Sequence, residues 1–292
     1  MSEPMSGNLL DRRIREYIKN MPSLPVTVAK VLEVCNNPHT SPADLNRVIS
    51  LDPVLVARVL KLINSAYYGL GQQVTSLVRA IIMLGINTVK NLALSSAVIE
   101  TLTSKSGGHG LNMDGFWRHS LCVGVAAKLL AKKRNLDVQQ IEEYFTAGLL
   151  HDIGKIPLNG VLNRQYMLTV SKADRDRISL FSAEDQTLGI NHCVTGHLIV
   201  NSWKLIGGVG DVIMSHHTPL EYQGPHLDLL YSVVTANRFA AIMEIGFSGD
   251  RYPEKLDPSI WEYLGVDQNV FDEIEPVVNS EIEKAAVFLS KR

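Results

Sequence analysis

Apolar residues recur at steps of three and four along most of this 292-residue chain, and this spacing limits the fold more than any other feature. Val28, Val31 and Cys35 illustrate the pattern, because residues at this spacing share one face of an α helix. We find no sustained alternation of apolar and polar residues, which a half-buried strand would need. The sequence therefore predicts an all-α protein.

The expected helices are delimited by start and stop signals. Ser41-Pro42 and Asp52-Pro53 each combine an N-cap side chain with proline at the first helical position, where its missing N–H is harmless. The remaining helices are expected over residues 9–17, over 28–35, from the cap Ser76 to Gly85, over 87–102, from the cap Asp114 to Leu130, over 138–150, from a capping box at Ser182-Ala183-Glu184-Asp185 to Trp203, over 209–217, over 227–245, and from the cap Asp267 to Leu289.

Composition and charge exclude several classes of function. Lys and Arg total 28 and Asp and Glu total 30, so the net charge of −2 gives no electrostatic basis for binding nucleic acid or a membrane surface. No stretch approaches the ~18 apolar residues of a membrane span, and residues 1–20 do not resemble a secretory signal, so we expect a cytoplasmic protein. Cys35, Cys122 and Cys193 match no zinc or disulfide pattern and are expected to be reduced thiols.

The stretch over residues 148–157 carries the strongest chemical signal. An apolar run that should be helical ends in His151 and Asp152, followed by Gly154, which we expect to let the backbone turn sharply. Neighbours on a helix diverge by about a hundred degrees, so both side chains could face one ion only at a helix end. The simpler alternative is a core histidine beside a capping aspartate.

Other histidines favour a metal site over that alternative. Five of the nine lie where a helical metal site would need them: His119, His151, His192, His216 and His217. Imidazole and carboxylate without cysteine predict a divalent transition metal such as Fe, Mn or Zn, and Asp152 could bridge two ions. Lys155 would then reach a phosphate oxygen, and Asp152 and Lys155 would be the catalytic residues of an active enzyme. Each histidine alone also has a structural explanation, in the core or at a helix end.

The order of these residues resembles the signature of the HD superfamily of metal-dependent phosphohydrolases, whose HD-GYP branch hydrolyses cyclic di-GMP at a two- or three-metal centre. The first half resembles a narrower family, the HDOD domains of bacterial signalling proteins, and the resemblance covers about residues 21–239. It is carried by the motifs Met21-Pro22-Ser23-Leu24-Pro25, Leu51-Asp52-Pro53-Val54-Leu55, Asn64-Ser65-Ala66-Tyr67-Tyr68-Gly69 and Ala80-Ile81-Ile82-Met83-Leu84-Gly85. The resemblance implies an HD-domain-like helical bundle with an additional N-terminal helical subdomain, in a family whose members generally lack a demonstrated activity.

This chain departs from both patterns. It keeps both His151 and Asp152, whereas many HDOD sequences have lost part of this His-Asp doublet. Asn237 stands where the HD superfamily places a last ligand Asp, so it would be a weak ligand, and residues 218–224 lack the Gly-Tyr-Pro motif of the cyclic di-GMP enzymes. We therefore expect a signalling module with a His/Asp metal pocket that is catalytically weak or inactive. The alternative is an active phosphohydrolase of a nucleotide or cyclic dinucleotide.

The expected organisation has five parts: an N-terminal helix over residues 1–20, the N-terminal subdomain over 21–103, a linker over 104–110, the HD-like core over 111–245 and a helical extension over 246–292. The flanks match no receiver or helix-turn-helix segment, so we expect a stand-alone domain. Its input would be a signalling protein or a small-molecule ligand such as a nucleotide, and homodimerisation through the last helix is a further option.

Overall fold

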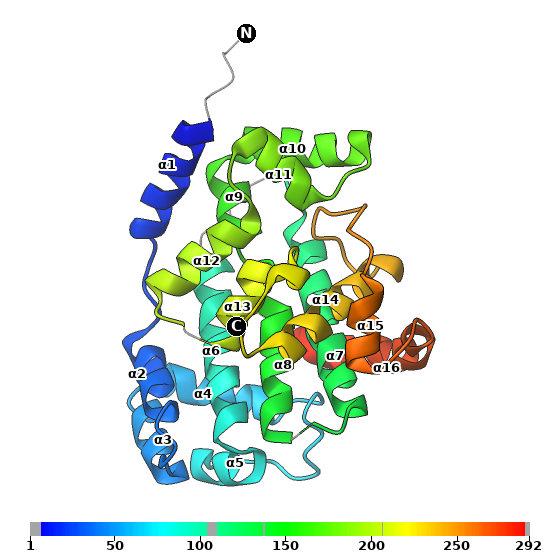
Figure 1. The fold of residues 1–292 in the computed structure, drawn as a ribbon. Coiled ribbons are helices and arrows are strands. Elements are labelled where there is room, and N and C mark those ends of the chain that lie inside the picture. The colour runs from blue at the N-terminus through cyan, green and yellow to red at the C-terminus, as the bar shows by residue number, and fades with distance from the viewer. Residues whose placement is uncertain (1–6, 104–109, 137, 206, 290–292) are drawn as a thin grey trace.

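The computed structural model describes residues 7–103, 110–136, 138–205 and 207–289, and no strand occurs within these ranges (Figure 1). The all-α prediction is therefore confirmed. In chain order the helices are α1 (Gly7–Lys19), α2 (Val26–Cys35), α3 (Pro42–Ile49), α4 (Pro53–Ile63), α5 (Leu77–Leu84), α6 (Ile86–Thr103), α7 (Met113–Lys133), α8 (Val138–Leu150), α9 (Lys155–Val161), α10 (Asn163–Asp176), α11 (Leu180–Leu188), α12 (His192–Ser202), α13 (Gly208–Ser215), the 3-10 helix η1 (Pro219–Glu221), α14 (Leu227–Ile242), α15 (Pro258–Leu264), α16 (Val270–Ala285) and the 3-10 helix η2 (Ala286–Phe288).

Helices α2 to α5 lie together at the lower end of the molecule in Figure 1, and α3, α4 and α5 begin at the predicted caps. The Ser41 hydroxyl accepts a hydrogen bond from the Asp44 N–H, and the Asp44 carboxylate accepts one from the Ser41 N–H, which completes a capping box at α3. Asp52 caps α4, Ser76 caps α5, and Gly85 ends α5 with a positive φ of 88°, which favours glycine. Local sequence signals therefore determine these boundaries.

Helices α7 and α8 form the centre of the molecule, with α14 packed on α7 and α6 packed on α8. The two central helices touch through their backbones, because a Cβ added at Gly148 would lie only 2.8 Å from the Gly124 Cα. No larger residue fits this crossing without moving a helix. The crossing matters for function, since α7 carries His119 and α8 leads directly into His151.

A buried polar cluster joins the N-terminal helices to this centre. The Tyr68 hydroxyl, in the turn after α4, donates a 3.1 Å hydrogen bond to Glu142 of α8. Glu142 is also paired with Lys128 of α7, whose Nζ lies 4.5 Å from the centroid of the Tyr67 ring. The motif at residues 64–69 thus packs against α7 and α8.

One predicted helix is wrong in a way that affects the site. The expected single helix from Ser182 to Trp203 is two helices, because Gly189 adopts a left-handed φ of 66° and ends α11. Ser179, and not Ser182, caps α11, while Asn191 caps the separate helix α12. His192 is consequently the first residue of a helix.

Smaller corrections concern other helix ends. Asn112, and not Asp114, caps α7. The Asp267 carboxylate accepts a hydrogen bond from the Asn269 N–H in the turn before α16, so it caps no helix, and α16 ends at Ala285 instead of Leu289. Helices α9 and α10 follow the His151-Asp152 turn in a region for which the sequence predicted no helix.

The predicted linker over residues 104–110 lies outside the described residues except for Gly110, and the five-part division of the chain stays a prediction. Among the described residues no single helix is long and apolar enough to span a membrane. Leu77–Leu84 and Ile86–Leu102 reach that length only together, and they are bent by 115°. All three cysteines are free, as predicted.

Candidate metal centre

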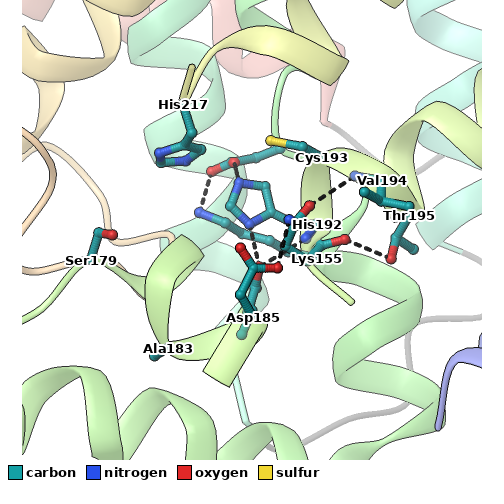
Figure 2. Close-up of polar contacts among 12 residues, drawn as sticks. Lys155, Ser179, Ala183, Asp185, His192, Cys193, Val194, Thr195 and His217 are labelled. Carbon is teal, nitrogen blue, oxygen red and sulfur yellow. Dashed lines mark hydrogen bonds and ion pairs between the residues drawn. The ribbon is translucent and has the colours of Figure 1, made fainter. Parts of the chain in front are cut away.

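The predicted histidines and Asp152 come from four separate parts of the chain and meet in the interior. His119 lies within α7, His151 and Asp152 form the turn after α8, His192 begins α12, and His216 and His217 follow α13. His151 and His192 are fully buried and Asp152 is 1% exposed. Figure 2 shows Lys155, His192 and His217 gathered between the surrounding helices. This close approach was not deducible from spacing along the chain.

Gly154 positions the His151-Asp152 turn for a reason other than the one expected. Its φ of −65° and ψ of −21° are ordinary for any residue, so a sharp backbone turn does not require glycine here. A Cβ at this position would lie 1.9 Å from the His192 carbonyl oxygen and 2.6 Å from the Gly196 backbone nitrogen. Glycine is therefore needed because the turn presses against the first turn of α12, which brings Asp152 beside His192.

Asp152 lies at the centre of the cluster, and its two oxygens have different neighbours. Oδ1 is 3.3 Å from His192 Nε2 and 3.5 Å from His216 Nε2, and it accepts no hydrogen bond within the described residues. Oδ2 is 3.3 Å from His151 Nε2 and accepts a 2.7 Å hydrogen bond from Lys155 Nζ. Burial alone would raise the pKa of Asp152, but the neighbouring His151 and Lys155 hold it well below its usual range.

Four of the histidines share one orientation. Each uses Nδ1 for a hydrogen bond to an acceptor outside the cluster, which leaves a lone pair on Nε2. The acceptors are the Gly148 carbonyl at 2.7 Å from His151, Glu184 at 2.6 Å from His192, the Val212 carbonyl at 3.1 Å from His216, and Glu254 at 2.9 Å from His217. This pattern is typical of metal-binding histidines, whose outer hydrogen bonds fix the ring orientation.

The Nε2 lone pairs of these four histidines point into the same region, and no ring proton lies between them. His192 Nε2 and His216 Nε2 are only 3.3 Å apart, and with the protons on both Nδ1 atoms neither can donate to the other. The buried Nε2 atoms of His151 and His217 have no hydrogen-bond partner among the described residues. Unpaired buried polar atoms are costly, so this arrangement fits a cation that accepts electron pairs from several of them.

The protonation states favour the same interpretation. Burial lowers the pKa of His119 to about 3 and of His217 to about 4, and it lowers the pKa values of His151 and His192. Neutral imidazole is the form that binds metals. Burial also raises the pKa of Glu184 to about 8 although the Lys155 charge opposes the shift, and a bound cation would favour the ionised carboxylate.

The ligand atoms divide into two groups that share Asp152. The α12–α13 half-site comprises Asp152, His192, His216 and His217, and the α7–α8 half-site comprises His119, His151 and Asp152, with all ligand atoms of a group within 4.8 Å of one another. Both donor sets fit a divalent transition metal in chemical type. A third group, at the edge of the cluster, is formed by His217, Asp250 and Glu254.

Two predicted residues, Asn237 and Lys155, are in hydrogen-bond contact with other site residues. Asn237 of α14 lies with its Oδ1 2.9 Å from His119 Nε2. Lys155 was expected to reach a phosphate, but it is 2% exposed and its ammonium group donates to Asp152 and, at 3.3 Å, to Ser248. These contacts distinguish the two half-sites.

Sequence reasoning missed the residues that orient the ligands. Glu184 is fully buried and accepts hydrogen bonds from the His192 ring, the His192 N–H and the Tyr166 hydroxyl. The sequence places Glu184 only in a predicted capping box, and no motif indicates that it is a partner of His192. Glu254, beside His217, follows Pro253 in a stretch without periodicity. The one sequence signal that could have suggested the role of Glu184 is the presence of an acidic residue eight positions before His192.

A cavity of about 480 Å³ reaches the cluster from one side, bordered by His216, His217 and Asn237. Its walls combine apolar side chains, including Leu220, Val234 and Ile260, with two basic residues, Arg238 and Lys255, and three acidic residues, Glu221, Glu254 and Asp257. A small molecule could therefore approach the histidines from solvent.

Comparison with known proteins places these features in a wider group. An uncharacterized protein of Treponema pallidum is 25% identical over 244 residues, which cover 83% of this chain and 46% of the relative. The chain therefore spans about half the length of the curated relative it matches. This relative carries no information about activity.

Solved structures support the fold. An HDOD domain protein of unknown function from Geobacter sulfurreducens superposes with a TM-score of 0.76 at 24% identity, covering 96% of this chain and 97% of that chain. A protein from Shewanella amazonensis SB2B, provisionally assigned as a phosphohydrolase, gives 0.71 at 24% identity, with 94% and 98% covered. A provisionally assigned signal transduction protein from Marinobacter aquaeolei VT8 gives 0.74 at 21% identity, with 99% and 68% covered.

The family itself is shown by the sequence match. Residues 21–219 match the HDOD domain, which is more than half of the chain and begins where the resemblance was predicted to begin. The match ends at residue 219, before the predicted end near residue 239. Together with the all-α fold and the buried His/Asp cluster, this match establishes that the chain belongs to the HDOD domain family.

Proposed function

We propose that this protein is an HDOD regulatory module in which a bound divalent transition ion has a structural or sensory role instead of a catalytic one. The observation that carries this proposal is the enclosure of the ligands. His151 and His192 are fully buried, Asp152 is 1% exposed, and Lys155 neutralises the Asp152 carboxylate from inside the protein. We expect such a site to hold an ion firmly and to leave room for other molecules only on the side where His216 and His217 border the cavity.

The position of the ion explains how occupancy would change the protein. The ligands come from the end of α8, the start of α12 and the end of α13, so one ion connects three helices. An ion present at a hundred times its dissociation constant stabilises the folded state by about 2.7 kcal/mol. Because α8 also contacts the N-terminal helices through Glu142 and Tyr68, this stabilisation extends toward them.

The surface of the N-terminal helices is a suitable output. It exposes four large apolar side chains, Leu51, Val54, Ile82 and Met83, with exposed fractions of 76%, 44%, 67% and 49%. Exposed apolar side chains favour contact with another protein. We propose that a signalling protein is the partner and that the state of the pocket determines how the module binds it.

One observation favours a second candidate, an active phosphohydrolase. The 480 Å³ cavity borders His216 and His217, and Arg238 and Lys255 in its walls could hold the phosphates of a nucleotide or cyclic dinucleotide. An ion with an open position supplies Lewis-acid chemistry and a low-pKa water for phosphoester hydrolysis. Under this hypothesis the cavity is the substrate site.

A comparison of activities separates the two candidates. The full chain, prepared without oxygen and loaded with Mn, Fe or Zn, is assayed with p-nitrophenyl phosphate, bis(p-nitrophenyl) phosphate and cyclic di-GMP. We expect no turnover above that of His192→Gln. Metal-dependent turnover that His192→Gln abolishes would favour the phosphohydrolase and contradict the regulatory proposal.

Hydrogen exchange tests the regulatory role directly. We expect metal to slow amide exchange in α12 and α13 and also in α8 and the N-terminal helices, because these elements are in contact. Slowing confined to the residues beside the ligands would contradict a sensory role and leave only a structural one.

A further inference from the structure

The two half-sites differ at His119. Its Nε2 lies 2.9 Å from the Asn237 Oδ1, so the ring N–H donates a hydrogen bond to the amide carbonyl. A ring nitrogen that donates has no lone pair for a metal. If the amide is turned over, its NH₂ group instead donates to the Nε2 lone pair, and that nitrogen is again occupied. Asn237 thus engages Nε2 of His119, which leaves Nδ1 as the only other possible ligand atom of that residue, and it supplies no anionic ligand of its own.

The two half-sites also differ at Asp152 Oδ2. The Lys155 ammonium donates a 2.7 Å hydrogen bond to Oδ2, the oxygen on the His151 side. Lys155 is only 2% exposed, and its ammonium group is held in place by a second, 3.3 Å hydrogen bond to the Ser248 hydroxyl. An ion bound at Oδ2 would lie beside a buried positive charge, and like charges repel strongly where water is excluded.

The α12–α13 half-site has neither obstacle. Asp152 Oδ1 accepts no hydrogen bond within the described residues, and the Nδ1 hydrogen bonds of His192, His216 and His217 leave their Nε2 lone pairs free to face it. One carboxylate oxygen and three imidazole nitrogens make a complete ligand set for a transition metal. Each ligand is held by a second hydrogen bond to the surrounding protein.

We infer that this protein binds one divalent transition ion, at the α12–α13 half-site, and that Lys155 and Asn237 together take the place of a second ion. This inference rests on the metal binding proposed above. It identifies Lys155 and Asn237 as the residues that set the number of ions. With one ion, the pocket cannot clamp a phosphate between two metals, which agrees with a regulatory role.

The number of ions per chain tests the inference without an activity assay. The metal-free full chain is saturated with Mn(II), freed of excess metal, and measured by elemental analysis and electron paramagnetic resonance. We expect wild type to hold one ion with the spectrum of an isolated Mn(II). His119→Gln should keep that ion and His217→Gln should lose it.

Restoring the second half-site provides the converse test. Asn237→Asp combined with Lys155→Met should raise the content from one ion to two and give the spectrum of two coupled Mn(II) ions. Asn269→Asp is the matched control, because Asn269 is exposed and far along the chain, and it should leave one ion. If the double variant is unfolded by circular dichroism, Asn237→Asp alone, which preserves shape, should bind the second ion more weakly than the first.

Three results would contradict us in distinguishable ways. Two ions in wild type would overturn the single-ion inference while leaving metal binding intact. If wild type holds one ion that is lost in His119→Gln but kept in His217→Gln, the ion lies in the α7–α8 half-site, and our assignment is wrong. A folded wild-type protein without any bound metal would instead overturn the proposed metal site itself.

Discussion

The α12–α13 and α7–α8 half-sites share Asp152 and have similar residue types, yet their ligand atoms are in different states. In the α12–α13 half-site, outer hydrogen bonds to Glu184, Val212 and Glu254 direct the free Nε2 atoms toward Asp152 Oδ1. In the α7–α8 half-site, Asn237 and Lys155 already occupy ligand atoms. The comparison teaches that the other partners of a ligand, more than its residue type, decide whether it can bind an ion.

The largest expected effect comes from removing a ligand of the α12–α13 half-site. His192→Gln replaces an imidazole that lies 3.3 Å from Asp152 Oδ1, and we expect it to abolish stoichiometric metal binding. Elemental analysis of the purified protein measures this, with His39→Gln as control because His39 is exposed and remote. If His192→Gln kept a full ion, the half-sites would be assigned the wrong way round.

Gly154→Ala should have the next largest effect, because it disturbs the contact between the His151-Asp152 turn and α12. The added Cβ would lie 1.9 Å from the His192 carbonyl oxygen, so we expect about 3 kcal/mol of destabilisation and weaker metal binding. Urea unfolding of the metal-free protein measures the free energy. Gly71→Ala is the control, since nothing lies within 4 Å of its added Cβ. Equal stability of both variants would show that α12 can shift freely.

Glu184→Gln should have a smaller effect on the same half-site. The amide can keep a hydrogen bond to His192 Nδ1 but cannot become the anion that a bound cation would favour, so we expect roughly 10- to 100-fold weaker metal binding with stoichiometry unchanged. Competition with a chelator of known affinity measures the change, and Glu262→Gln on the surface is the control. An unaltered affinity would mean that Glu184 is only a packing residue.

The smallest effect concerns the pH dependence of stability in the metal-free protein. His119 and His217 have pKa values lowered by burial to about 3 and about 4 from the ordinary 6.5, so the unfolded chain binds protons more readily than the folded one. Their contribution to stability is therefore complete above pH 6.5 and is lost as the pH falls toward 4 and then 3. His119→Gln should flatten the lower part of this dependence in urea unfolding curves. An unchanged curve would show that His119 does not titrate as a buried group.

Much of the fold was predictable because its signals are local. Ser41 and Asp52 cap their helices through atoms only two or three residues away, and periodicity alone predicts the helices that follow. The error at Ser182 arose because Ser179 and Ser182, three positions apart, offer similar caps, and the left-handed Gly189 decided where α11 ends. Local signals cannot weigh such alternatives.

The site was predictable in its residues and not in their contacts. The adjacent His151 and Asp152, together with the family resemblance, indicated the cluster. The role of Glu184 depends on how α11 packs beside α12, and the direction of Lys155 depends on a buried contact with Asp152. Gly154 was singled out for its backbone freedom, whereas the structure needs it for a contact with residues about forty positions later. Contacts of this kind arise only from the packed fold.

Anomalous diffraction from crystals of the Mn- or Zn-loaded protein, recorded at the absorption edge of the metal, tests the central claim most directly. We predict a single peak among Asp152 Oδ1 and the Nε2 atoms of His192, His216 and His217, with Lys155 still bonded to Oδ2. A second peak between His119 and His151, or a single peak there, would contradict the account.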